Sequence, residues 1–169
     1  MEKNKVVFLD RDGTINYDYG YVHEKNKLKF LPGVIEGLKK LQNNDYKLII
    51  ITNQSGIGRG YYTENEYHIF TKYMLEKLQE NNIYIEDIYY CPHTEKDNCN
   101  CRKPKLKLFY DAIKDHNIDT NKSYVIGDKE RDIAICNTTP ITGILIYNKS
   151  DNYICKEDLL DAVNFIIEK

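Results

Sequence analysis

The sequence predicts an α/β fold in which helices flank a doubly wound, Rossmann-like parallel sheet. Two observations predict this fold. Short apolar runs typical of buried strands alternate with segments of helical periodicity, and polar or acidic residues follow several of the runs. Such alternation requires parallel crossovers, which place a ligand beyond the carboxyl ends of the strands. With 169 residues and no linker, residues 1–169 are expected to form a single domain.

Five apolar runs rich in β-branched and aromatic residues are the predicted strands. They are Val6–Leu9, Leu48–Ile51, Ile83–Tyr90, Tyr124–Ile126 and Ile144–Tyr147. Their short length and composition favour buried strands over helices.

Helical patterns lie between and after these runs. Apolar residues share one face in three segments: Val34, Leu38 and Leu41; Leu108, Phe109, Ala112 and Ile113; and Leu159, Leu160, Val163, Ile166 and Ile167. Thr63 and Glu66 match a capping box, which predicts a helix running from there to about Asn81. The stretches Arg11–Pro32 and Cys91–Pro104 are predicted to be insertions within the domain.

Composition and charge exclude several classes of protein. Hydrophobic residues make up 41% and charged residues 30%, which are ordinary globular values. The net charge is −2 and no long basic run occurs, so a nucleic-acid partner is not expected. The first apolar run, Val6–Leu9, is too short for a signal peptide or a membrane span. We expect a cytoplasmic monomer that acts on a small molecule, without a membrane partner.

The polar residues at the predicted strand ends suit phosphate chemistry. Asp10 and Asp12 follow the first strand, and Asp128 follows the strand Tyr124–Ile126. Neighbouring carboxylates require a counter-charge, which Mg²⁺ supplies while taking further ligands from a phosphate. Thr52 and Asn53 begin a glycine-containing turn of the kind that binds phosphate oxygens. Taken alone, Asp-x-Asp indicates a simple turn equally well, and the second segment more often is one.

Three cysteines and a histidine lie close together in one predicted loop. Cys91, His93, Cys99 and Cys101 supply three thiols and an imidazole, a ligand set suited to tetrahedral Zn²⁺. The alternative is a reduced loop with free cysteines. Because the set needs no open position, the predicted zinc is structural, and residues 91–101 form a zinc-loop insertion that places Arg102 and Lys103.

Taken together, the strand-end motifs resemble those of the haloacid dehalogenase phosphatase superfamily. The match runs from Val6 to about Ile146 and includes Arg102-Lys103-Pro104 between the second and third motifs. The resemblance implies that Asp10 attacks phosphorus, and that Asp12 protonates the leaving oxygen and later activates water. It also implies that Thr52 and Lys103 hold the phosphoryl group, with Mg²⁺ bound by Asp10, the backbone carbonyl of Asp12 and Asp128. Arg11 is expected to point away from this pair of carboxylates, and Asp132 only to cap or to hydrogen-bond.

Within the superfamily, the zinc loop and the segment Thr52–Gly60 are similar to the heptose bisphosphate and histidinol-phosphate phosphatases. That branch lacks a large mobile cap, and short loops shape its substrate pocket. Tyr21 and His23 match a loop that the heptose enzymes place against their sugar. Arg59 and Arg102 are then expected to hold a second phosphate. Asn53 and Lys129 are further candidates for substrate binding.

The substrate has competing interpretations. Lys105–Leu108 replaces the Pro-Gly-Met type turn of the heptose enzymes, and the gap between His93 and Cys99 is short; both features are closer to the histidinol-phosphate enzymes. The Tyr21–His23 loop and the absence of a fused second domain favour a heptose bisphosphate. A nucleic-acid 3′-phosphatase is a third interpretation, which the net charge disfavours. A non-catalytic phosphate-binding module is a fourth, although both catalytic carboxylates are present.

Overall fold

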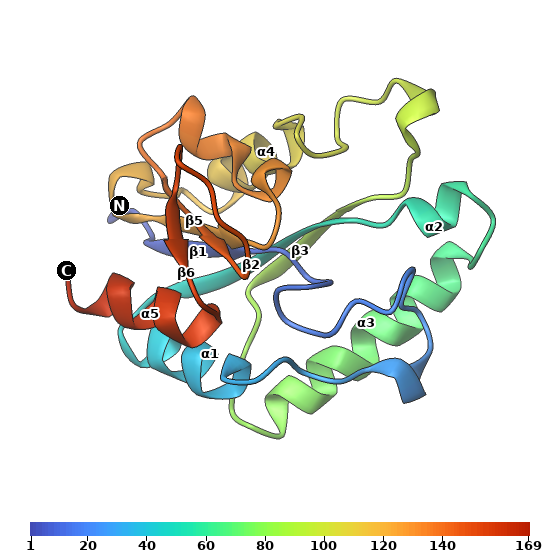
Figure 1. Cartoon of the computed structure of the whole chain (residues 1–169), viewed down its shortest axis with the longest axis horizontal. Coiled ribbons are helices and arrows are strands. Elements are labelled where there is room, and N and C mark those ends of the chain that lie inside the picture. Colours follow the sequence, from blue (N-terminus) through green and yellow to red (C-terminus); the bar gives the residue numbers. More distant parts are fainter.

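A six-stranded parallel sheet forms the centre of the protein in the computed structural model, which describes residues 1–169 (Figure 1). Its strands are β1 (Val6–Leu9), β2 (Lys47–Asn53), β3 (Asp87–Cys91), β4 (Tyr124–Gly127), β5 (Thr142–Ile146) and β6 (Ile154–Lys156). They lie in the order β3-β2-β1-β4-β5-β6, and every neighbouring pair is parallel. The predicted doubly wound fold is therefore confirmed, with β1 and β4 at the point where the strand order reverses.

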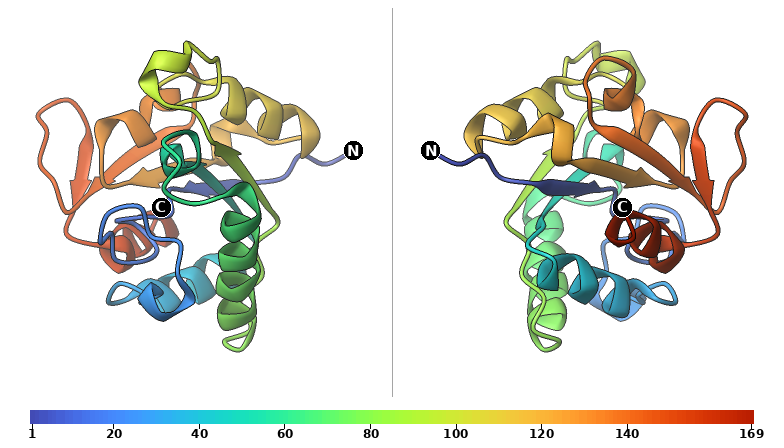
Figure 2. Two further views of the ribbon diagram at one scale, coloured as in Figure 1. Left: turned by 90° about the vertical axis from the view of Figure 1, so that its right-hand side faces the viewer. Right: turned by 90° about the vertical axis from the view of Figure 1, so that its left-hand side faces the viewer.

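Helices cover both faces of the sheet (Figure 2). The α-helices of the protein are α1 (Val34–Asn43), α2 (Ser55–Gly58), α3 (Glu64–Gln79), α4 (Lys107–Asp115) and α5 (Leu159–Ile167), and all but the short α2 pack on the sheet. The alternation along β1 explains the two layers: Val7 and Leu9 join a buried cluster with α1, α3 and α5, whereas Val6 and Phe8 join another with α4. Such a strand is buried on both faces, so its sequence is continuously apolar.

Some boundaries differ from the sequence-based expectations. The run Ile83–Tyr90 becomes a strand only from Asp87, because Asn82 turns with a positive φ of 59° and Ile83 packs into the core as a loop residue. The strand β6 was not predicted, since Ile154–Lys156 is too short and too exposed to give an apolar run. The capping box of Thr63 and Glu66 is present at the start of α3.

Two long connections shape the edge of the sheet at which the strands end. One joins β1 to α1 and carries a short 3₁₀ helix, η1 (Lys25–Lys27); the other joins β3 to α4 and carries η2 (Glu95–Asp97). Three further 3₁₀ helices are η3 (Thr120–Lys122), η4 (Glu130–Asp132) and η5 (Ala134–Asn137). None of the helices has the length and apolarity needed to cross a bilayer.

Candidate functional site

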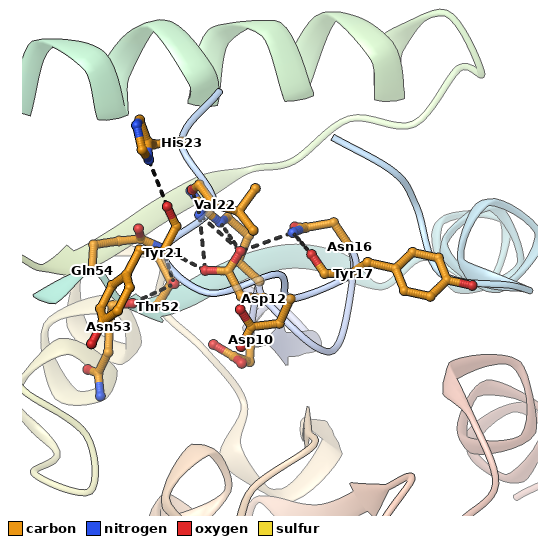
Figure 3. Close-up of polar contacts among 12 residues, drawn as sticks. Asp10, Asp12, Asn16, Tyr17, Tyr21, Val22, His23, Thr52, Asn53 and Gln54 are labelled. Carbon is orange, nitrogen blue, oxygen red and sulfur yellow. Dashed lines mark hydrogen bonds and ion pairs between the residues drawn. The ribbon is translucent and has the colours of Figure 1, made fainter. Parts of the chain in front are cut away.

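The carboxyl ends of three adjacent strands bring the predicted motifs together. Asp10 follows β1, Thr52 and Asn53 end β2, and Asp128 follows β4. Because β1 pairs with β2 on one side and β4 on the other, these residues meet at one edge of the sheet. The close-up in Figure 3 shows Asp10, Asp12 and the end of β2 facing one another.

Three carboxylates and one buried lysine form the deepest part of the site. Oxygens of Asp10, Asp128 and Asp132 all lie within 4.8 Å of one another. The Nζ atom of Lys103 lies 2.9 Å from Asp10 Oδ1 and 2.9 Å from Asp132 Oδ1, and donates to the Ile51 carbonyl at 2.6 Å. Lys103 Nζ therefore contacts three oxygens, two carboxylate and one carbonyl, which hold the side chain in place.

The positive charge of this group is too small to balance its carboxylates. Burial raises the pKa of Asp10, Asp132 raises it further, and Lys103 acts in the opposite direction. Burial and Asp132 likewise raise the pKa of Asp128. Burial would lower the pKa of Lys103, but Asp10 and Asp132 hold it above its usual value, so the lysine stays charged. One lysine cannot balance three carboxylates, and an oxygen-ligand set of this kind fits a hard divalent cation such as Mg²⁺.

Two glycines allow the acidic side chains to pack closely: Asp132 lies against the backbone of Gly127, and Asp128 lies against the backbone of Gly13. A Cβ on Gly127 would lie 2.3 Å from the Asp132 Cβ, and one on Gly13 would lie 2.5 Å from Asp128 Oδ2. Gly13 also has a positive φ of 85°, which glycine adopts without strain. Asp132 was expected only to cap or to hydrogen-bond. It accepts from the Lys129 backbone N–H at 3.0 Å and in addition pairs with Lys103, so it shares in the charge balance of the site.

Asp12 is held by hydrogen-bond donors on several sides. Arg11 donates to both of its carboxylate oxygens at 3.0 Å, Asn16 donates at 3.0 Å and Gln54 at 3.1 Å. Gln54 is itself oriented by Tyr62, whose hydroxyl donates to its Oε1 at 2.6 Å. The sequence reveals neither Gln54 nor Tyr62, because only the fold brings the end of β2 beneath the loop that carries Asp12.

The expectation for Arg11 was wrong. Its guanidinium donates two hydrogen bonds to the carboxylate of the neighbouring Asp12 and a third, at 2.7 Å, to the Val22 carbonyl. It also lies 4.7 Å from the ring centre of Phe70. The side chain is 2% exposed, so it is buried beneath the site rather than turned away from it. A buried guanidinium needs an anionic partner, and the adjacent carboxylate supplies one.

The two residues at the end of β2 differ in their contacts. Thr52 is buried, and its hydroxyl accepts from Gln54 at 2.9 Å. Asn53 clamps the backbone of Lys103, since its Nδ2 donates to the Lys103 carbonyl at 3.1 Å and its Oδ1 accepts from the Lys103 N–H at 3.0 Å. Asn53 thus ties the connection after β3 to β2 and places the lysine at Asp10.

A polar pocket of about 290 Å³ opens above these residues. It is lined by Asp10, Asp12, Asp18, Gly20, Tyr21, Asn53, Gln54, Ser55, Arg59, Tyr62, Glu95, Arg102, Lys129, Arg131 and Asp132. His23 does not line it; its ring stacks on Tyr62, with centroids 4.6 Å apart. Tyr21 lies at the mouth, edge-on to Tyr61. Five of the six predicted substrate-binding residues therefore face one pocket, and His23 supports its wall.

Glu95 and Arg131 also line the pocket and were not predicted from the sequence. Glu95 lies between Arg59 and Arg102, 2.8 Å from one guanidinium and 2.7 Å from the other. Arg131 adds a cation from η4 and forms no ion pair with a carboxylate. A single charged residue in a loop gives no signal in the sequence, because many such residues are simply solvated.

The thiol and imidazole groups of the second connection form one compact cluster. The ligand atoms of Cys91, His93, Cys99 and Cys101 all lie within 4.8 Å of one another. The His93 Nδ1 atom is 3.5 Å from Cys91 Sγ and 3.3 Å from Cys101 Sγ, and Cys91 Sγ is 3.6 Å from Cys99 Sγ and 2.7 Å from Cys101 Sγ. Ligands about 2.3 Å from a tetrahedral zinc lie about 3.8 Å apart. The four ligand atoms are therefore close enough together to hold a metal ion such as Zn²⁺, and the Cys91–Cys101 pair lies about 1 Å closer than that spacing.

Comparisons with known proteins agree with this geometry. The sequence profile of the family described as polynucleotide kinase 3 phosphatase matches residues 5–158. The D-glycero-beta-D-manno-heptose-1,7-bisphosphate 7-phosphatase of Haemophilus influenzae is 46% identical over 136 residues, which cover 77% of this chain and 74% of that protein. The enzyme of the same name from Helicobacter pylori is 48% identical over 134 residues, covering 79% and 78% of the two chains.

A solved structure has the same fold. The D,D-heptose 1,7-bisphosphate phosphatase of B. bronchiseptica, crystallised with magnesium and phosphate, superposes with a TM-score of 0.88. The superposition covers 97% of this chain and 98% of that one, at 24% sequence identity. At 24% identity this likeness shows a shared fold only. Information on activity comes from the relatives from Haemophilus influenzae and Helicobacter pylori, which are 46% and 48% identical.

Proposed function

The chain belongs to the polynucleotide kinase 3 phosphatase family of haloacid dehalogenase-type phosphatases, and we propose that it removes the 7-phosphate of D-glycero-D-manno-heptose 1,7-bisphosphate. The observation that carries this proposal is the high identity to enzymes of that name from Haemophilus influenzae and Helicobacter pylori, each matched over about three quarters of its length. The carboxylates, lysine and arginines at one edge of the sheet provide the chemistry that such a reaction needs.

In the proposed mechanism, Asp10 is the nucleophile that attacks phosphorus and becomes a phosphoaspartate. Lys103 lies 2.9 Å from Asp10, where its charge lowers the repulsion between a carboxylate and a dianionic phosphate. Asp10, Asp128 and the backbone carbonyl of Asp12 would hold Mg²⁺, which when bound neutralises further charge on the transferred phosphoryl group. The Thr52 hydroxyl helps to hold that group.

Asp12 carries the proton transfers in this proposal. It donates a proton to the leaving sugar oxygen, and the resulting carboxylate then takes a proton from the water that hydrolyses the phosphoaspartate. Arg11, Asn16 and Gln54 fix the position of its carboxyl group through hydrogen bonds of 3.0 to 3.1 Å. Positioning of this kind supplies much of the catalysis in phosphoryl transfer.

Arg59 and Arg102 bind the second phosphate of the substrate in this proposal. They line the same pocket as Asp10, one from the segment after β2 and the other from the connection after β3. Guanidinium groups pair with phosphate oxygens through two parallel hydrogen bonds. Tyr21 and Lys129 complete the wall around the sugar. The monomeric state and the cytoplasmic location stay predictions.

Two other substrates compete with the heptose. The family description names a polynucleotide 3′-phosphatase, so a nucleic acid is the second candidate. Histidinol phosphate is the third, because of the short zinc loop. The relatives with substrates in their names favour the heptose, and arginines would repel the ammonium of histidinol phosphate.

A substrate panel tests the function. With Mg²⁺, we expect kcat/KM for heptose 1,7-bisphosphate to exceed that for histidinol phosphate or a 3′-phosphorylated oligonucleotide by about tenfold or more, the factor for one charged hydrogen bond. EDTA is expected to abolish all three activities. Preference for the oligonucleotide, with a strong dependence on salt concentration, would establish a nucleic-acid phosphatase instead.

We propose that zinc in the cluster of Cys91, His93, Cys99 and Cys101 anchors the connection that carries Arg102 and Lys103. The fully reduced protein is expected to contain about one equivalent of zinc, because four ligands close a tetrahedral site. Cys99→Ser should lower both the melting temperature and the activity. Cys155→Ser, which changes a cysteine outside the cluster, is the matched control and should retain zinc. Elemental analysis without zinc, or equal melting temperatures for both variants, would contradict the anchor.

A further inference from the structure

A single carboxylate bridges the two arginines at the pocket. Glu95 Oε2 lies 2.8 Å from Arg59 Nη2, and Glu95 Oε1 lies 2.7 Å from Arg102 Nη2. Glu95 starts η2 in the connection after β3, whereas Arg59 follows α2, so the bridge joins two separate segments. From the sequence, both arginines were expected to be available for a second phosphate, but in this structure one carboxylate already takes both.

The bridge engages one donor group on each arginine that an incoming phosphate could also use. Arg59 turns its Nε to the Ser55 hydroxyl at 3.2 Å, and Arg102 has Nη1 near the His93 carbonyl at 3.5 Å. On each arginine, Nη2 donates to the Glu95 carboxylate. A phosphate that spans the two guanidiniums with two of its oxygens would occupy the place of this carboxylate.

We propose that Glu95 is a built-in competitor for the second phosphate: it holds Arg59 and Arg102 in the free enzyme and gives way when that phosphate binds. This inference rests on the proposed function, because it requires a substrate with two phosphates.

The exposure of the three side chains explains why Glu95 yields. Its side chain is 62% exposed, whereas those of Arg59 and Arg102 are 30% and 13% exposed. The carboxylate therefore returns to water at little cost while the arginines stay in the wall, and exposed ion pairs are individually weak. A phosphate dianion carries more charge and more acceptor oxygens than a carboxylate, so it binds the guanidinium groups of Arg59 and Arg102 more strongly than Glu95 does.

Competition also affects the product. Removal of the 7-phosphate leaves heptose 1-phosphate, which keeps the phosphate that the arginines bind. Glu95 is tethered beside them and rebinds at a high effective concentration, which favours release of this product. Glu95 thus raises both KM for the bisphosphate and the inhibition constant of the product. It does not contact Asp10 or Asp12, so it has no part in the chemical step.

Steady-state kinetics of Glu95→Gln test the proposal. KM for heptose 1,7-bisphosphate and Ki for heptose 1-phosphate should both fall by about three- to tenfold, the factor for losing two exposed ion pairs. The ratio of kcat/KM for the bisphosphate to that for heptose 7-phosphate, which lacks the second phosphate, should rise. Glu86→Gln is the matched control: it removes an exposed carboxylate paired with Lys47 at 3.5 Å, before β3 and away from the pocket. It should change none of these constants.

A second background separates competition from a general charge effect. In the Arg59→Ala/Arg102→Ala enzyme, adding Glu95→Gln should no longer lower KM, because the guanidinium groups for which Glu95 and the phosphate compete have been removed. Glu95→Ala should match Glu95→Gln, which guards against an effect specific to glutamine. A rise in KM, no shift beyond that of Glu86→Gln, or a shift that persists without the arginines would overturn the proposal. If the wild-type enzyme does not prefer the bisphosphate, the proposed function itself fails.

Discussion

Asp10→Asn is expected to lower kcat by about 10⁴-fold or more, the scale seen when a catalytic nucleophile is removed. The amide keeps the size of the side chain but cannot attack phosphorus. The fold should persist, because Lys103 keeps its contacts with Asp132 at 2.9 Å and with the Ile51 carbonyl at 2.6 Å. Turnover of heptose 1,7-bisphosphate and the melting temperature are the two measurements.

Asp45→Asn is the matched control for this variant. It makes the same chemical change in the turn before β2, where the backbone has a positive φ of 64° that asparagine tolerates well. The control should be fully active. If Asp10→Asn keeps activity near the wild-type level, the assignment of the nucleophile fails. If instead it is inactive because it is unfolded, the melting curve reveals that directly.

Asp12→Asn is expected to lower kcat by about 10²- to 10⁴-fold on an alkyl phosphate, since it removes the proton donor for the leaving group. A phenyl phosphate with a good leaving group needs less help from an acid and should lose less. The comparison of these two substrates on one enzyme preparation is the decisive measurement. Asp10→Asn should show no such difference, because both substrates need the nucleophile.

The same variant also tests how Asp12 is held. Asp12 is the ion-pair partner of the buried Arg11, at 2.9 Å, so Asp12→Asn leaves that guanidinium unpaired and should lower the melting temperature. Partial unfolding cannot mimic the predicted result, because it reduces activity on both substrates by the same factor. An equal loss on the alkyl and the phenyl phosphate would count against Asp12 as the acid.

The fold and the deepest site residues were predictable for a local reason. A continuously apolar run such as Val6–Leu9 suits only a strand buried on both faces, and several such strands alternating with helices form a parallel sheet. Parallel strands end at one edge, so Asp10, Thr52 and Asp128 had to meet there, as they do. The cluster of three cysteines and one histidine was equally predictable, because its four members lie within one short stretch of chain.

The side-chain contacts between distant segments were not predictable in this way. Asn53 was predicted to bind substrate and it does line the pocket, but its amide also makes two hydrogen bonds to the backbone of Lys103. His23 was assigned to the sugar, yet it stacks on Tyr62 outside the pocket lining. Each contact joins residues far apart in the sequence, so no local pattern reveals it.

The class of fold, the edge of the sheet that carries the chemistry and the residue types that face it could be predicted from the amino-acid sequence. Apolar periodicity and the ends of strands are local properties, and they are visible in a single chain. How the charges are balanced is visible only in the folded protein, where Lys103 lies between Asp10 and Asp132, Arg11 pairs with Asp12, and Glu95 lies between Arg59 and Arg102. Charge balance depends on distances of a few ångströms between separate segments, and those distances exist only once the chain has folded.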